Sequence, residues 1–256
     1  MDTLSGTTNR PTQGIFFQAP LGYVNDPTDF SGMENLLNTW GYYVEFNKDI
    51  RPAFINAMSN PPPYKYRFRL MEMMEPSNQL TIYSLTSGTA NVGYNGYGWF
   101  TTPLNSTAPD VHVLAENIIA LVILPKLSAA DEATGNYTDG SLAPNYYYDS
   151  TGLNMTTLSD PNLNPLNQLP PVVQVTMVAV DEASYNRFQS AQGNNNMPTS
   201  LGLGGLFQSV GDTTNPSNPG YAQDVQTLQT TMQANKLNYR IFTSNISIRG
   251  AKWSRN

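Results

Sequence analysis

One stretch, residues 168–188, constrains the fold of this chain more than any other. It reads QLPPVVQVTMVAVDEASYNRF. The four residues at alternate positions from Val173 to Ala179 are all apolar, which is the period of a strand with one face against a core. Asp181 follows at once and is placed to cap a helix that begins at Glu182. The sequence therefore predicts a core strand that runs straight into a capped helix.

Periodic apolar residues predict further elements on both sides of this unit. Strands are expected over residues 14–20, 42–46, 64–70, 118–124 and 237–249, and helices over residues 32–38 and 221–232. The run 118–124 is apolar on both faces, which predicts a central strand covered on both sides. In 237–249 the apolar residues change phase, which predicts a bulge near Thr243.

These elements together predict an α+β fold. It should contain one or two antiparallel sheets, flanking helices and long polar loops. Residues 1–13 are polar and are expected to be disordered or frayed. No internal repeat or clear linker divides the remainder, so residues 14–256 are expected to form a single domain.

The composition argues against several classes of function. The chain has no cysteine, which excludes disulfides and cysteine-bound metals. It has 13 lysines and arginines against 19 acidic residues, so nucleic-acid binding is not expected. No apolar stretch is long enough to span a bilayer. Charged residues make up only 12% of the chain, and a neutral polar surface rich in tyrosine is typical of envelope and extracellular proteins.

The strand expected over 64–70 alternates apolar and aromatic residues with Lys65, Arg67 and Arg69. Such a row of cations could be a binding stripe. The favoured interpretation is a solvated outer face that protects an edge strand from pairing with other chains.

The strongest enzyme-like signal is Asn25-Asp26-Pro27, close after the first expected strand. It is similar to the Asn-Asp-Pro signature of family 32 glycosidases, which are invertase-like β-propellers. That resemblance implies Asp26 as the nucleophile, with a second carboxyl group about 5 Å away. The family's Arg-Asp-Pro and Glu-Cys segments have no counterpart here, and a turn after a strand is the favoured interpretation.

The other candidate residues are too isolated to predict a site. His112 is the only histidine, so it has no partner of its own kind for a metal. Asp139, Asp149 and Asp160 lie in a long polar connection, and their spacing is not that of a calcium loop. Asp181 and Glu182 are adjacent, but helix capping explains Asp181. We therefore predict no catalytic residue, no cofactor and no metal site.

Several long phrases of the sequence resemble one family. They are GIFFQAP (14–20), NLLNTWGYYVEF (35–46), PYKYRFRLMEM (63–73), WFTTPL (99–104), VLAENIIALVILPKLS (113–128), NPLNQLPPVVQVTMVAVDEAS (164–184) and LNYRIFTSNISIRGAKWS (237–254). This is similar to the Verru_Chthon cassette protein C family of Verrucomicrobia and relatives. Its members are prepilin-like proteins, broadly similar to the J-type minor pseudopilins of type II secretion and to the W-type minor pilins.

The resemblance implies a role in an assembly rather than a reaction. It implies a minor pilin or pseudopilin head on the periplasmic or extracellular side of the cell envelope, with other pilin-like subunits as partners. Such proteins begin with a short leader and an apolar anchor helix of about 20 residues. Neither is seen before Gly14, so membrane attachment is expected only through a helix outside this sequence. Two alternatives stay open: a glycosidase that uses Asp26, and an extracellular carbohydrate- or surface-binding module with tyrosine and tryptophan platforms.

Overall fold

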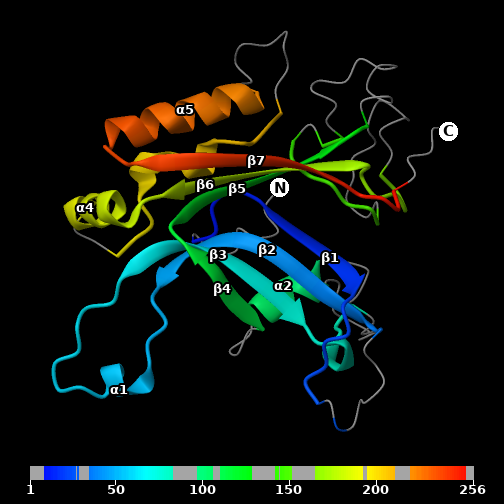
Figure 1. The fold of residues 1–256 in the computed structure, drawn as a ribbon, viewed down its shortest axis with the longest axis horizontal. Coiled ribbons are helices and arrows are strands. Elements are labelled where there is room, and N and C mark those ends of the chain that lie inside the picture. Colours follow the sequence, from blue (N-terminus) through cyan, green and yellow to red (C-terminus); the bar gives the residue numbers. More distant parts are fainter. Residues whose placement is uncertain are drawn as a thin grey trace.

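The computed structural model describes residues 9–26, 28, 35–82, 97–105, 110–128, 142–143, 145–151, 165–192, 195–210 and 220–251. These residues form the expected α+β fold, with two antiparallel sheets and several helices (Figure 1). The polar connections at 83–96, 129–141 and 152–164 lie outside the described residues, as do residues 1–8.

Sheet A contains four strands in the order β1-β2-β3-β4. They are β1 (Gly14–Pro20), β2 (Leu37–Lys48), β3 (Tyr66–Glu75) and β4 (Val111–Glu116). The helix expected over 32–38 is wrong at its C-terminal end, because β2 already begins at Leu37 and pairs there with Pro20. An apolar pair such as Leu36-Leu37 fits a helix or a strand equally well, and pairing with β1 selects the strand.

Sheet B contains three strands in the order β5-β6-β7. They are β5 (Ile118–Lys126), β6 (Val172–Val180) and β7 (Tyr239–Ser247). Asn117 alone joins β4 to β5, and its φ of 62° places it in the left-handed region that asparagine tolerates. This one residue turns the chain from sheet A into sheet B.

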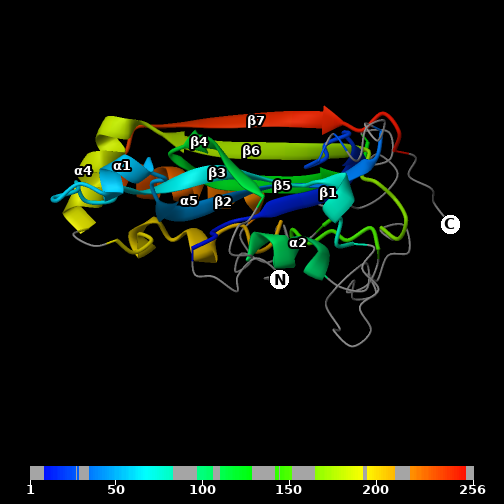
Figure 2. The same cartoon turned by 90° about the horizontal axis from the view of Figure 1, so that it is seen from below.

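The helices lie around the two sheets (Figure 1 and Figure 2). They are α1 (Ala53–Asn56), α2 (Gly98–Leu104), α4 (Glu182–Gln192) and α5 (Tyr221–Ala234), with short 3₁₀ helices η1 (Ser77–Gln79), η5 (Thr199–Leu201) and η6 (Leu203–Gly205). Both α4 and α5 begin where their sequence patterns predict. In the described part of the chain, no helix has the length and hydropathy needed to cross a membrane.

The elements stack in layers. Figure 1 shows α5 above sheet B and sheet B above sheet A, and Figure 2 shows α2 on the far side of sheet A from β7. The main core lies between the two sheets and under α4 and α5, where Phe46, Phe68, Ile119, Tyr185 and Leu228 are fully buried. A smaller core of Tyr43, Met71, Met73, Phe100 and Leu104 joins sheet A to α2.

Strand β6 is covered on both faces, and the face that carries its polar residues is the more deeply buried one. The face that carries Gln174 and Thr176 is buried, whereas Val175 and Met177 on the opposite face are only half-buried. The Thr176 hydroxyl lies 2.7 Å from the Tyr221 hydroxyl of α5 and 3.2 Å from Oγ1 of Thr243 on β7. These contacts satisfy the hydroxyl of Thr176 although it is buried. Helix α5 therefore covers the face that carries Gln174 and Thr176, and not the wholly apolar face that the sequence pattern predicts to be in the core.

Strand β5 is buried along almost its whole length, as the sequence predicts, but it is not hydrogen-bonded as a central strand. It pairs only with β6, and residues just before β1 occupy its other edge. Gln13 donates its backbone N–H to the Leu121 carbonyl (3.2 Å), and its Oε1 accepts from the Ile123 N–H (2.7 Å). Residues 9–13 thus make specific hydrogen bonds, in contrast to the frayed segment expected there.

Strand β7 runs without a bulge. Its register with β6 is continuous from Tyr239 to Ser247, so the irregularity predicted near Thr243 is wrong. The phase change has another cause: Ile241 packs toward α5, whereas Phe242 and Ile246 lie on the other face and are largely exposed. An edge strand with so little burial can carry apolar residues on both faces without a break in its pairing.

Candidate interaction surfaces

Asp26 lies on the exposed chain that follows β1. Its Oδ1 accepts a hydrogen bond from the Thr28 N–H (3.0 Å), which is the arrangement of an Asx turn. The described strands form one four-stranded and one three-stranded sheet, not the five blades that a family 32 glycosidase requires. The local geometry of Asp26 is therefore that of a turn residue.

The cationic stripe of β3 is not a solvated face, and this expectation is wrong. Arg67 and Arg69 are 3% and 1% exposed, because β3 is an inner strand of sheet A and other polar groups close over the stripe. Only Lys65, before the strand begins, is exposed. Alternation along a strand shows which residues share a face, but it cannot show that another element covers that face.

Arg67 joins sheet A to the start of α4. Its Nη2 donates to Glu182 Oε1 (2.5 Å) and to Asn186 Oδ1 (2.9 Å), and its Nε lies 3.7 Å from Glu116 Oε2. Burial acts to raise the pKa of Glu182, but hydrogen bonds from Asn117 and Asn186 and the charge of Arg67 together hold that pKa below its ordinary value. Glu182 is thus a structural partner of Arg67 and not one of a pair of reactive acids.

A hollow of about 520 Å³ opens beside this cluster, between β3 and α4. Its lining is largely polar: Tyr64, Lys65, Tyr66, Arg67, Asn186, Gln189, Ser190 and Asn195. Because the guanidinium of Arg67 is already engaged by two carboxylates, it is poorly suited to bind an anion from solution.

The remaining candidates do not assemble into a site. His112 is exposed on β4. Asp149 accepts hydrogen bonds from Tyr97 (3.1 Å) and from Thr151, while Asp139 and Asp160 lie outside the described residues. Within the described ranges, no group of three acidic or histidine side chains is placed to hold a metal ion.

The tryptophans that could serve as carbohydrate platforms are half-buried where the structure describes them. Trp40 donates its Nε1–H to the Tyr42 hydroxyl (2.7 Å) and to Glu72 Oε1 (3.0 Å). Trp99 packs edge-to-face on Phe100. Trp253 lies outside the described residues. Neither Trp40 nor Trp99 therefore offers a freely exposed ring face.

A protruding segment, residues 49–65, carries the two most exposed large apolar side chains among the described residues, Ile50 and Phe54. We call this segment the arm; it joins β2 to β3 and extends away from both sheets (Figure 1). Ile50, Phe54 and Met58 are 80%, 70% and 53% exposed. Helix α1 within the arm has no buried residue. The side chains at its tip therefore contribute nothing to the core.

The base of the arm is nevertheless braced. Asp49 and Lys65 exchange hydrogen bonds, with the Asp49 N–H on the Lys65 carbonyl and the Lys65 N–H on Asp49 Oδ1, both at 2.8 Å. Arg51 binds Asp49 Oδ2 (2.8 Å) and the carbonyls of Pro62 and Pro63. Its guanidinium also lies 4.1 Å from the Tyr64 ring centroid. These contacts hold the arm in one orientation although its tip is exposed.

Sequence reasoning missed the arm. Its signal is present in Pro61-Pro62-Pro63, which cannot continue an α-helix or a paired strand, together with bulky apolar residues in a region that lacks any periodic pattern. Apolar residues that are exposed as a group mark contact sites more often than exposed apolar residues that lie singly on a surface.

Comparison with known proteins gives no relative from which a function could be transferred. No protein-family model, no curated protein and no solved structure matches the chain significantly.

Proposed function

We propose that this protein is a non-enzymatic structural subunit that works through protein–protein contact. Its setting would be that of a minor pilin or pseudopilin head, in a type IV pilus or a type II secretion-like assembly of the cell envelope. The phrases of sequence described above favour that setting, and an α+β head with antiparallel sheets is compatible with it. Its partners would be other pilin-like subunits.

The observation that carries the proposal is the braced arm with its exposed apolar tip. Ile50, Phe54 and Met58 remain in water although their burial would be favourable, by about 1.5–3 kcal/mol for each fully buried side chain. Because the base of the arm is already held in place, less conformational entropy is lost when a partner binds the tip. The arm is therefore suited to insert apolar side chains into a neighbouring subunit.

A photo-crosslinking residue at Phe54 tests this proposal in cells that produce the assembly. We expect crosslinks from Phe54 to proteins that carry a prepilin leader and an apolar N-terminal helix. The matched control is a crosslinker at Leu21, which is also exposed but lies away from the arm. The substitution Phe54→Asp should abolish co-purification of the same partner.

Equal, unspecific crosslinking from Phe54 and Leu21 would contradict the contact role of the arm. Two other outcomes would support the alternatives. Glycan hydrolysis that is lost on Asp26→Asn would favour the glycosidase, and a specific glycan that is bound without hydrolysis would favour the carbohydrate-binding module.

A further inference from the structure

Strand β7 presents a long edge that is unpaired among the residues that the structure describes. Its nine residues, YRIFTSNIS, pair with β6 on one side only. Exposed strand edges are usually protected by proline, lysine, a bulge or short length. β7 contains none of these, and Arg240 is its only charged residue.

The other sheet edges are protected in the usual ways. β1 ends in Pro20, and β4 is short and irregular in its register with β3. The outer edge of β5 is occupied by Thr12 and Gln13. β7 is thus the edge best suited to accept a further strand.

The hydrogen bonds at the two ends of β7 determine which residues face outward. Ile248 donates its N–H to the Pro171 carbonyl, and Asp181 donates its N–H to the Asn238 carbonyl. Because hydrogen-bonded pairs alternate along an antiparallel ladder, the even-numbered residues of β7 bond to β6. The odd-numbered residues, from Tyr239 to Ser247, therefore direct their backbone N–H and C=O groups to the free edge.

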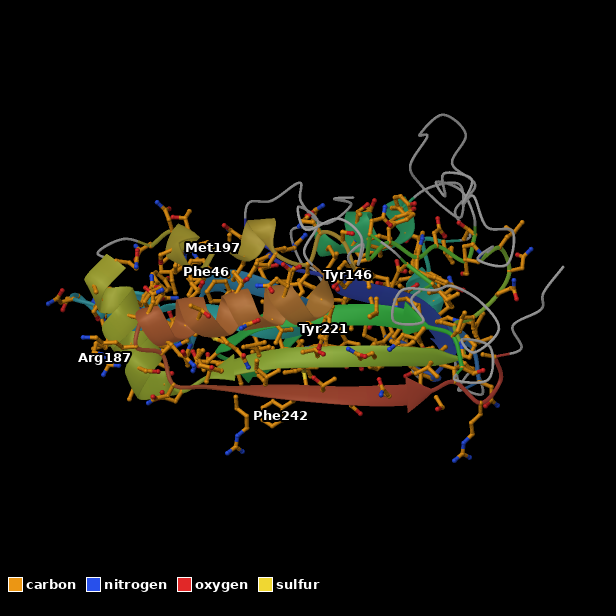
Figure 3. All side chains as sticks on the ribbon, turned by 90° about the horizontal axis from the view of Figure 1, so that it is seen from above. Phe46, Tyr146, Arg187, Met197, Tyr221 and Phe242 are labelled. Carbon is orange, nitrogen blue, oxygen red and sulfur yellow. The ribbon has the colours of Figure 1, made fainter. Side chains whose placement is uncertain are left out.

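The sequence of β7 places two apolar residues symmetrically about Ser244, one residue past the middle of the strand. Phe242 and Ile246 are 46% and 52% exposed and lie on the same face, with Ser244 midway between them. This is the face away from α5, since Thr243, on the opposite face, contacts Thr176 beneath that helix. Figure 3 shows β7 as the outermost strand, with α5 set back from it and Phe242 directed outward.

We propose that β7 pairs antiparallel with β7 of a second copy of this chain, about a two-fold axis through Ser244. Phe242 then lies opposite Ile246 of the second copy, and the reverse contact is made at the same time. The outward-facing residues Thr243 and Asn245 fall opposite each other as a hydrogen-bonded pair. Phe242 and Ile246 fall in non-hydrogen-bonded pairs, where side chains are closest.

The pattern favours a second copy over an unrelated strand. A two-fold interface needs a surface that is complementary to itself, and two apolar residues spaced equally about Ser244 meet that need. Arg240 falls opposite Ile248 of the second copy, so no like charges meet. A two-fold through Thr243 instead would place Phe242 opposite Ser244 and would lose both apolar pairs. The result is one continuous sheet across two heads.

This inference goes beyond the proposed function, because it depends on β7 and not on the arm. Sedimentation of the purified protein over a dilution series should show a monomer–dimer equilibrium. Phe242→Lys combined with Ile246→Lys should weaken the dimer by about tenfold or more. Leu114→Lys, an equally exposed apolar residue on β4, should leave it unchanged. A wild-type monomer at every concentration would overturn the inference.

Cysteine scanning tests the register, since the chain has no cysteine of its own. Ser244→Cys places two thiols across the two-fold axis in a non-hydrogen-bonded pair, so we expect a rapid disulfide dimer. Thr243→Cys and Arg240→Cys should crosslink far more slowly. Faster crosslinking of Thr243→Cys would overturn the register. Failure of all three would overturn the pairing, while crosslinks from Phe54 to other subunits would be unaffected.

Discussion

Glu75 carries a carboxyl group that is buried at the end of β3, at 3% exposure. Its Oε1 accepts the Thr81 N–H (3.1 Å), but its Oε2 has no hydrogen-bond partner in the described part of the chain. Burial, with a smaller contribution from the charge of Asp110, raises the pKa of Glu75 to about 7. No pattern in the sequence distinguishes Glu75 from the half-buried Glu72 on the same strand, because their difference comes from what covers each residue.

This shifted pKa predicts how stability depends on pH. Below pH 4.5 the carboxyl is protonated in both the folded and the unfolded chain. Between 4.5 and about 7 only the unfolded chain releases the proton, so the contribution of Glu75 to stability falls as pH rises. The free energy of unfolding of Glu75→Gln, relative to wild type, should therefore be higher above this pH window than below it by roughly 3 kcal/mol, at about 1.4 kcal/mol for each unit of pKa. Urea unfolding of Glu75→Gln and wild type, below pH 4.5 and above about pH 7, measures the difference between their free energies of unfolding. A difference that is the same at both pH values would contradict the prediction.

The start of α4 depends on its N-cap, and this defines a prediction for the element. Oδ1 of Asp181 accepts the N–H groups of Ala183 (2.9 Å) and Ser184 (3.1 Å). Asp181→Ala should lower the thermal midpoint and speed amide exchange in the first turn of α4, whereas Asp181→Ser should retain most of the stability. Hydrogen bonds from Ser184 hold the pKa of Asp181 below its ordinary 3.8, so the effect should be present at neutral pH and fade as pH falls below that value. Equal behaviour of the two variants would show that the cap is not needed.

The elements whose hydrophobic pattern agrees with their burial in the fold could be predicted from the sequence. β6 with its capped helix α4, the buried β5 and the amphipathic α5 were all expected from periodicity. Two predictions, a solvated cationic face on β3 and a bulge in β7, were wrong for opposite reasons. Arg67 and Arg69 are polar but buried, because Asn47 and the start of α4 supply their partners. Phe242 and Ile246 are apolar but exposed, because β7 lies at an edge.

The candidate surfaces were less predictable than the fold. Ile50 and Phe54 could be placed on a protruding arm only after β2 and β3 had been paired in three dimensions. The free edge of β7 likewise follows from strand order, which periodicity within one strand cannot give. A sequence pattern reports the local period of burial, whereas a contact surface depends on which faces and edges the other elements leave open.

At the scale of the whole molecule, one side chain connects the two sheets. Arg67 extends from β3 of sheet A to Glu182, where α4 leaves sheet B, and it reaches Asn117 at the corner between β4 and β5 (3.5 Å). Asn117 in turn donates to Glu182 Oε2 (2.8 Å). The corner, the sheets and the helix therefore share one polar network, which should make them unfold together.

Removal of Arg67 tests that coupling. Arg67→Ala should reduce the free energy of unfolding by roughly 2–4 kcal/mol, because it leaves a cavity and unpaired polar groups where the sheets meet. Lys65→Ala, two residues away and exposed, should change it by less than about 0.5 kcal/mol. Denaturant unfolding followed by both circular dichroism and tryptophan fluorescence would measure the two variants. If Arg67 couples the sheets, its loss should also separate the unfolding transition seen by circular dichroism from the one seen by fluorescence. Backbone amides of α4 and β4 should then exchange with solvent before those of β2. An Arg67→Ala variant with wild-type stability and one shared transition would mean that apolar packing between Phe46, Phe68 and β5 alone joins the sheets.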